Sequence, residues 1–166
     1  MGVRVAAIVL GVLACALPPS AVARDTHVSA VLNGYSYHLP RDYYNERNVG
    51  YGLQIDAAWG DHHAMFGGGT YRDSYYTHAD YLGAGYNYRI WEHAFRFSRG
   101  FMDAGLVVLV AKSAGYSKYY HVPILIAPLP WVSVGNERVA VNIMFAPAPS
   151  DNYASVLTLQ FKFVII

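Results

Sequence analysis

The stretch VGYGLQIDAAW, residues 49–59, alternates between apolar and small or polar side chains from its first residue to its last. One set of alternate positions holds Val49, Tyr51, Leu53, Ile55, Ala57 and Trp59. The other set holds Gly50, Gly52, Gln54, Asp56 and Ala58. Because successive side chains of a β-strand point to opposite faces, this period of two predicts a strand with one apolar face and one small or polar face.

The C-terminal segment, residues 153–163, repeats this alternation. Leu159 and Phe161 fall on one face, whereas Gln160 and Lys162 fall on the other. A shift of one residue in the strand pairing would turn Gln160 and Lys162 to the apolar side. If that side meets lipid, a lysine at the middle of the membrane costs about 2–4 kcal/mol, so the register is well defined.

Strand-like segments recur along the chain, with turn-forming residues between them. The expected strands cover residues 28–38, 49–59, 63–73, 80–89, 100–112, 119–128, 131–145 and 153–163. A turn at Gly135-Asn136-Glu137 falls inside this series, and we interpret residues 119–145 as two strands that meet at that turn. The total is eight strands, and strands of about 9–11 residues suit an outer-membrane barrel of the smallest common size.

The first 23 residues have the organisation of a cleaved signal peptide. Arg4 precedes the apolar run of residues 5–17, and Ala21-Val22-Ala23 offers a cleavage site. The apolar run is too short to span a bilayer as a helix. We therefore expect an exported barrel domain of residues 24–166. A lipoprotein signal that ends before Cys15 stays open as an alternative.

Two architectures fit eight alternating strands: a membrane barrel with its apolar face outward, and a soluble lipocalin-like barrel with that face inside. Export, a hydrophobic content of 54%, a mean hydropathy of +0.19 and 15 tyrosines favour the membrane barrel. Tyrosine has an apolar body and a polar tip, which suit a membrane–water boundary. The expected fold is therefore all-β, an eight-stranded antiparallel transmembrane β-barrel of the bacterial outer membrane.

Several ligand classes are not expected. The net charge of +1 provides no strong field for nucleic acid. Asp61-His62-His63 falls in a predicted turn, and we interpret it as a turn rather than a metal site. Gly67-Gly68-Gly69 has no Lys-Ser/Thr after it and lies within a strand pattern, so it indicates room inside a barrel rather than a phosphate loop. No metal or other cofactor is expected.

The predicted topology brings polar residues from separate strands to one rim. If the chain enters on the periplasmic side, the first and third strands both end at the outer rim, near His38 and Asp73-Ser74. A histidine can act as a general base near neutral pH, a carboxylate can orient it, and a hydroxyl can donate to an oxyanion. The chemistry that fits these residues is acyl transfer to a hydroxyl.

From about Gly34 to Phe163 the sequence resembles the PagP family, the outer-membrane lipid A palmitoyltransferases. The most specific resemblance is Tyr44-Asn45-Glu46-Arg47 in the first loop, together with the Tyr and His of residues 35–38 and Asp73-Ser74. Supporting pieces are Ala84-Gly85-Tyr86, Ser133-Val134-Gly135, Pro147 and Gln160-Phe161-Lys162-Phe163.

The resemblance implies a specific reaction. It implies transfer of an acyl chain, palmitate or somewhat shorter, from the sn-1 position of a phospholipid to a hydroxyl of lipid A. The chain would occupy the outer interior of a monomeric barrel, and phospholipid would enter laterally between strands weakened by prolines. By analogy, His38 deprotonates the acceptor, Asp73 supports His38, Ser74 assists, and residues 44–47 (Tyr44, Asn45, Glu46 and Arg47) support the loop.

Two departures from the family pattern have consequences. About 14 residues separate Ala23 from His38, so the amphipathic helix that precedes the first strand of well-known members is expected to be absent. Asn87 stands where those members have a glycine at the floor of the acyl pocket. An inward Asn87 would raise the floor and shorten the accepted chain, at ~0.8 kcal/mol for each lost CH₂. A different acceptor such as phosphatidylglycerol, and a non-catalytic small barrel for adhesion or membrane integrity, stay open as alternatives.

Overall fold

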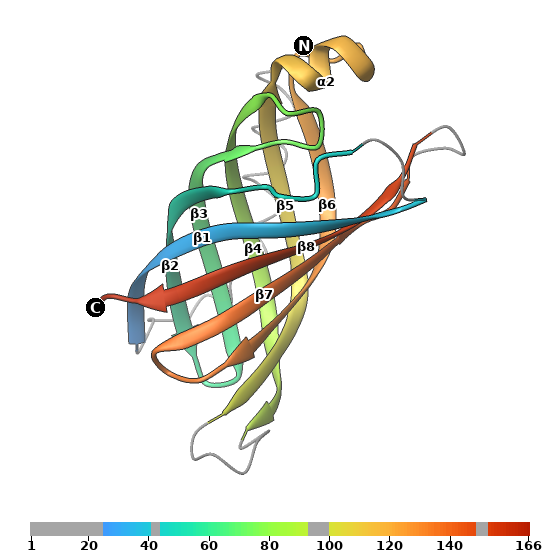
Figure 1. Cartoon of the computed structure of the whole chain (residues 1–166). Helices are drawn as coiled ribbons and strands as arrows, with labels where there is room; N and C mark the ends of the chain where they lie inside the picture. The colour runs from blue at the N-terminus through green and yellow to red at the C-terminus, as the bar shows by residue number, and fades with distance from the viewer. Residues whose placement is uncertain (1–24, 41–43, 93–99, 149–152) are drawn as a thin grey trace, which may run out of the picture.

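The computed structural model describes residues 25–40, 44–92, 100–148 and 153–166, which form one closed barrel (Figure 1). Each strand pairs antiparallel with its neighbour in sequence, and β1 pairs with β8 to close the barrel. The predicted all-β, eight-stranded fold is confirmed. The strands are β1 (Asp25–Leu39), β2 (Gly50–Trp59), β3 (His62–Arg72), β4 (His78–Glu92), β5 (Phe101–Ser113), β6 (Leu125–Gly135), β7 (Val139–Ala146) and β8 (Ser155–Val164).

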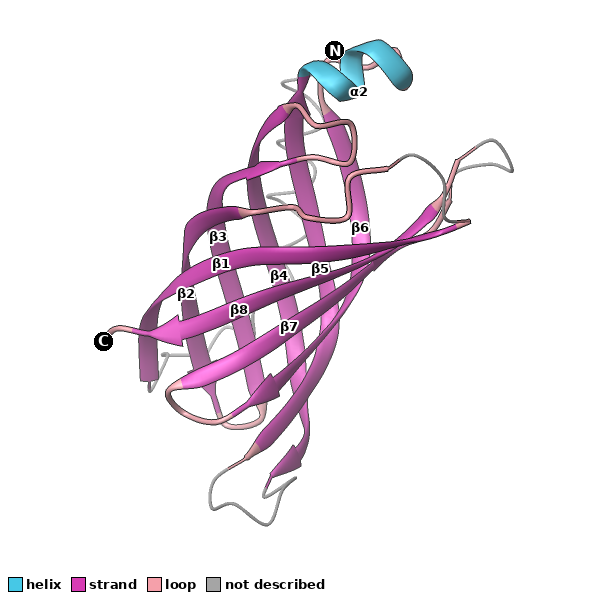
Figure 2. Ribbon diagram, viewed as in Figure 1, coloured by secondary structure: helices cyan, strands magenta, loops and turns pink. Residues whose placement is uncertain are grey.

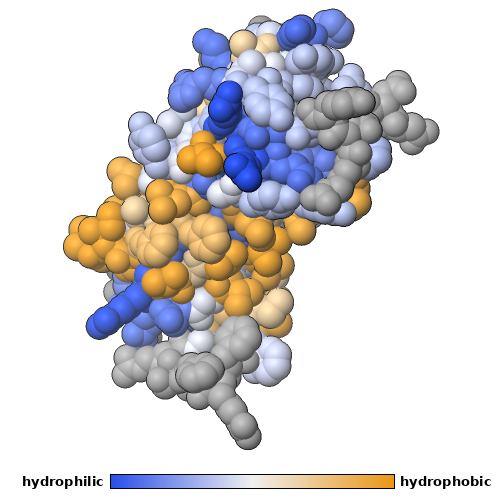
Figure 3. Space-filling model, viewed as in Figure 1, coloured by the Kyte–Doolittle hydropathy of each residue, from blue (hydrophilic) through white to orange (hydrophobic). Residues whose placement is uncertain are grey.

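The alternation in β2 sorts side chains between the outside and the interior as the sequence predicts. The Leu53 residue is 57% exposed, whereas its neighbour Gln54 is only 2% exposed. On the face in Figure 3, apolar side chains gather in a band around the lower half of the barrel, with a polar surface above it. Such a band is the surface that an outer-membrane barrel presents to lipid.

The chain between β5 and β6 differs from the expected strand pattern. A short helix, α2 (Ala114–Tyr119), follows β5 directly, and Ser113 caps it by accepting a hydrogen bond from the Gly115 backbone. β6 begins only at Leu125 rather than at residue 119. The intervening His121 has a φ of 56°, and Pro123 lacks a backbone donor, so neither favours a regular strand.

No helix in the described part of the chain is long and apolar enough to cross a membrane. The predicted turn after residue 135 is confirmed, since β6 ends at Gly135 and β7 begins at Val139. The predicted signal peptide and the predicted absence of a helix before β1 concern residues 1–24, which lie outside the described residues.

The two ends of the barrel differ. β1 begins and β8 ends at one end, where tight turns at Gly60 and Asn136 join β2 to β3 and β6 to β7. The other end carries residues 44–48, residues 73–77 and α2. Short turns face the periplasm and longer loops face the outside in outer-membrane barrels, so the end with α2 is the extracellular one.

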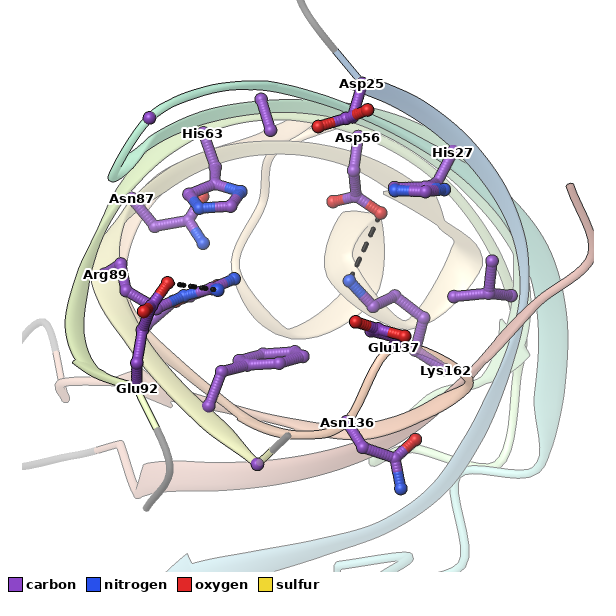
Figure 4. Close-up of a pocket in the computed structure, with 16 residues that line it drawn as sticks. Asp25, His27, Asp56, His63, Asn87, Arg89, Glu92, Asn136, Glu137 and Lys162 are labelled. Atoms are coloured by element: carbon purple, nitrogen blue, oxygen red, sulfur yellow. Dashed lines mark hydrogen bonds and ion pairs between the residues drawn. The ribbon is translucent and has the colours of Figure 1, made fainter. Parts of the chain in front are cut away.

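The barrel interior contains two compartments. An apolar cavity of about 630 Å³ occupies the extracellular half, and a polar chamber of about 430 Å³ occupies the periplasmic half (Figure 4). Between them lies a partition layer of buried side chains that line neither compartment: Ser29, Trp131, Ser133 and Asn142. Within the chamber, Lys162 forms an ion pair of 3.2 Å with Asp56, so the register predicted for β8 is confirmed.

Candidate functional site

The ends of β1 and β3 bring a histidine and a serine into contact. The His38 Nε2 atom lies 2.8 Å from the Ser74 hydroxyl, although 36 residues separate them in sequence. The Tyr44 ring stacks on the His38 ring, with centroids 4.5 Å apart and an interplanar angle of 14°. His38 is only 1% exposed. The predicted meeting of His38 and Ser74 at the outer rim is thus present in the structure, at hydrogen-bond distance.

Asp73 is fully buried and organises the loop between β3 and β4. Its carboxylate accepts hydrogen bonds from the backbone N–H groups of Tyr75 (2.9 Å) and Thr77 (2.8 Å). It also accepts from the Thr77 hydroxyl (2.7 Å) and from the hydroxyl of Ser113, which caps α2. The carboxylate therefore ties the loop to the end of β5 and the start of α2.

The partner of His38 is Ser74 rather than Asp73. Every hydrogen bond of the Asp73 carboxylate within the described residues goes to its own loop or to Ser113, and none goes to His38. Support of His38 by Asp73 stays a prediction, and the geometry offers one route for it. Asp73 fixes the loop conformation that presents the next residue, Ser74.

The first extracellular loop is bonded to this second loop through Asn45. The Asn45 backbone N–H donates to the Ser74 carbonyl (2.8 Å), and its side-chain amide donates to the Asp73 carbonyl (3.0 Å). The Glu46 carbonyl accepts from the Ser36 backbone on β1 (2.8 Å). These bonds fix the Ser74 backbone against β1, which is consistent with the predicted supporting role of this loop.

The members of the predicted loop motif do different things. Tyr44 stacks on His38, Glu46 accepts a hydrogen bond from the Tyr35 hydroxyl, and the side chain of Arg47 is exposed. Sequence reasoning missed Asn48, which is buried and donates to the Arg72 carbonyl (2.8 Å). A single asparagine before a strand is too common to have marked it.

Tyrosines from three separate segments surround the extracellular mouth. Tyr75 stacks on Tyr119 with centroids 4.1 Å apart, and Tyr120 stacks on Tyr153 at 4.8 Å. Burial raises the pKa of Tyr116 in α2 to about 12 and also raises the pKa of Tyr75 above its ordinary value. These two phenols therefore stay neutral near pH 7. The sequence indicated tyrosines at a membrane boundary, but not that α2 would stack them against the loops.

Ser74 lies on the wall of the apolar cavity, whereas His38 is not one of the residues that line it. Ser74 is therefore the residue of this pair that borders the cavity. The rest of the wall is mainly apolar. Its members on the strands include Val31, Met65, Gly83, Val107, Leu109, Ala127, Leu129, Met144 and Ala146.

One side of this cavity is bounded by incompletely paired strands. The β6–β7 ladder contains five residue pairs, from Trp131–Met144 to Gly135–Ala140, and leaves residues 125–130 of β6 without a partner on β7. Figure 2 shows the two strands diverging toward the extracellular end. The unpaired stretch includes Pro128 and Pro130, which have no backbone N–H to donate.

Asn87 faces the barrel interior, is 5% exposed and lines the polar chamber (Figure 4). It does not line the apolar cavity. In the strand register Asn87 pairs with Gly105, and Gly105 pairs with Trp131 of the partition layer. Trp131 packs against Val107 and Leu129, which line the cavity. The role of Asn87 as the floor of the acyl pocket stays a prediction. Trp131 of the partition layer is a second candidate for that floor.

Comparison with known proteins identifies the family. No curated protein sequence matches the chain. Among solved structures, Ail, the attachment invasion locus protein of Yersinia pestis, is similar at 12% identity and a TM-score of 0.41, over 84% of this chain and 95% of that chain. Neisserial surface protein A is similar at 12% identity and a TM-score of 0.38, over 84% and 97%. A family model described as "Antimicrobial peptide resistance and lipid A acylation protein PagP" matches residues 22–161, most of the sequence, and this outer-membrane barrel therefore belongs to the PagP family.

Proposed function

We propose that this protein transfers a fatty acyl chain from the sn-1 position of a phospholipid to a hydroxyl of lipid A. The family description supports lipid A acylation. The observation that carries the proposal is the Ser74 hydroxyl, which is hydrogen-bonded to His38 and lies on the wall of an apolar cavity of about 630 Å³. That volume falls within the roughly 300–1,000 Å³ typical of small-molecule sites. An acyl chain in the cavity could bring its ester to this pair.

The site residues take the following roles in the proposed reaction. His38 acts as the general base, with one ring face covered by Tyr44. Asp73 holds the loop that presents Ser74, and Asn45 holds that loop against the first one. Glu46 and Arg47 complete the supporting segment, in which Glu46 bonds to β1.

The donor reaches the cavity through the wall of the barrel. The unpaired stretch of β6 offers a passage because Ala127 and Leu129 of β6 and Met144 and Ala146 of β7 line the cavity on its two sides. Pro128 and Pro130 remove backbone donors there, which keeps the pairing weak. Phospholipid from the outer leaflet would enter by this route.

The accepted chain is palmitate or somewhat shorter. The partition layer, which includes Trp131, ends the cavity inside the barrel, and Asn87 lines the chamber beyond it. A chain that is one methylene too long loses about 0.8 kcal/mol of burial, or must displace these side chains. The length of the transferred chain therefore reports the depth of the cavity.

The test is mass spectrometry of lipid A from a host that lacks its own enzyme of this kind and expresses this chain. We expect a new species that carries one additional acyl chain and is absent with His38→Ala. His27→Ala, a histidine substitution at the polar chamber, is the matched control and should leave the species unchanged. Absence of the species, with the folded protein recovered in the outer membrane, would favour a non-catalytic barrel or a different acceptor.

The same cells test two further parts of the proposal. N-terminal sequencing of the protein from the outer membrane should begin at Arg24, if cleavage follows Ala23. Light scattering in detergent should give the mass of one barrel, if the protein acts as a monomer. A mature N-terminus at Cys15 would instead indicate a lipoprotein signal.

A further inference from the structure

Ser74 both lines the apolar cavity and is the hydrogen-bond partner of His38. His38 itself is 1% exposed, its ring face is covered by Tyr44, and its Nε2 atom points at the serine hydroxyl at 2.8 Å. Of the two residues, Ser74 therefore lies nearer to the contents of the cavity.

The hydrogen bond between the two residues is compatible with a nucleophile and its base in one of the two tautomers of His38. If Nε2 is to accept the Ser74 proton, the proton of the neutral imidazole must sit on Nδ1, which is buried with no partner among the described residues. A serine hydroxyl whose proton is held by a histidine nitrogen is an activated nucleophile.

We infer that Ser74 is the nucleophile and that the reaction passes through an ester between the transferred acyl group and Ser74. This inference rests on the proposed acyl transfer and replaces direct attack by the acceptor with two steps. The Ser74 oxygen attacks the carbonyl carbon of the phospholipid ester, and its proton moves to His38 Nε2. The bond from that carbon to the glycerol oxygen breaks, and the same proton passes to the glycerol oxygen to give a lysophospholipid.

The second step reverses these roles. The acceptor hydroxyl oxygen attacks the carbonyl carbon of acyl-Ser74, and its proton moves to His38 Nε2. The bond from carbon to the Ser74 oxygen breaks, and the proton returns to that oxygen. In both steps His38 Nε2 holds the transferred proton, and the sum is one ester broken and one ester formed. Asp73 is a positioning residue in this scheme, because among the described residues its carboxylate bonds to its own loop and to Ser113.

The test uses the full-length mature protein in mixed micelles with dipalmitoyl phosphatidylethanolamine and no acceptor. After acid quenching, intact-mass spectrometry should show one palmitoyl group in place of one proton, and peptide mapping should place it on Ser74. The adduct should disappear when lipid A is added. It should be absent from Ser74→Ala and His38→Ala. Ser117→Ala, the same change in α2 outside the site, should form it like the parent protein.

Each outcome decides the inference. Transfer to lipid A with no adduct, and with lysophospholipid released only when donor and acceptor are both present, would overturn it and leave Ser74 as a proton relay. An adduct without transfer would uphold Ser74 as nucleophile and reject lipid A as the acceptor. Neither adduct nor transfer, from protein with normal β-sheet circular dichroism, would reject both proposals. Ser74→Cys adds a check, since its adduct is a thioester that hydroxylamine cleaves.

Discussion

The anchoring role of Asp73 predicts that residues without any contact to His38 control the activity. Ser113 and Thr77 are those residues, because their hydroxyls donate to the buried Asp73 carboxylate from the end of β5 and from the loop itself. Removing either hydroxyl changes neither the His38 side chain nor the Ser74 side chain. It removes one of the bonds that keep the loop in its observed conformation.

The size of the effect follows from the hydrogen bonds. A bond to a charged group contributes about 1.5–3 kcal/mol, and every 1.4 kcal/mol corresponds to a factor of ten in a population. If the loop needs this bond to keep its observed conformation, Ser113→Ala should therefore lower the rate of lipid A acylation by about 10- to 100-fold. Asp73→Asn should lower it further, because an NH₂ group replaces an oxygen that accepts from both hydroxyls.

The assay is the initial rate of lipid A acylation by purified protein in micelles, measured for Asp73→Asn, Ser113→Ala and Thr77→Ala. Hydrogen exchange of the Tyr75 and Thr77 amides, which donate to Asp73, should speed up in the same variants. The reasoning fails if Asp73→Asn abolishes activity while Ser113→Ala and Thr77→Ala keep the parent rate and the parent exchange. The Asp73 charge would then act on His38 directly.

Three further predictions concern other parts of the barrel. Trp131→Leu should deepen the apolar cavity and shift the acyl groups on lipid A toward longer chains by mass spectrometry; an unchanged distribution would place the floor elsewhere. Tyr44→Ala should lower the acylation rate by up to about tenfold, since an aromatic stack contributes ~0.5–1.5 kcal/mol, whereas Tyr44→Phe should keep it; equal losses would show that the stack on His38 is unimportant. Asp56→Ala leaves Lys162 charged and unpaired inside the barrel, which should lower the free energy of unfolding in urea by about 3–5 kcal/mol; a change below about 1 kcal/mol would mean that water solvates Lys162 in the chamber.

The barrel could be predicted from sequence because its pattern is local. Alternation along residues 49–59 and 153–163 fixed which side chains face inward, and Gln54 and Lys162 are buried as that pattern requires. The start of β6 could not be predicted as easily. Apolar residues and tyrosines continue through residues 119–124, and the positive φ of His121, which interrupts the strand pattern there, is not visible in the sequence.

The candidate site was predictable only in part, for a related reason. The direction of the strands alone places His38 and Ser74 at the same rim, because β1 and β3 run in the same direction and end there. The partners of Asp73 depend on how a loop packs against α2, and Ser113 is 40 residues away from it in sequence. The division of the interior into two compartments could likewise not be predicted from the sequence. Alternation shows which residues face inward, but not which of them meet across the barrel.

The partition layer also has a consequence for the barrier that the outer membrane maintains. Many larger barrels enclose a water-filled channel, and a polar chamber open to one side could be mistaken for half of one. Here Trp131 and Asn142 are almost completely buried and line neither the chamber nor the cavity, which separates the two compartments in the described chain. We therefore expect the purified protein to produce no conductance steps in a planar bilayer.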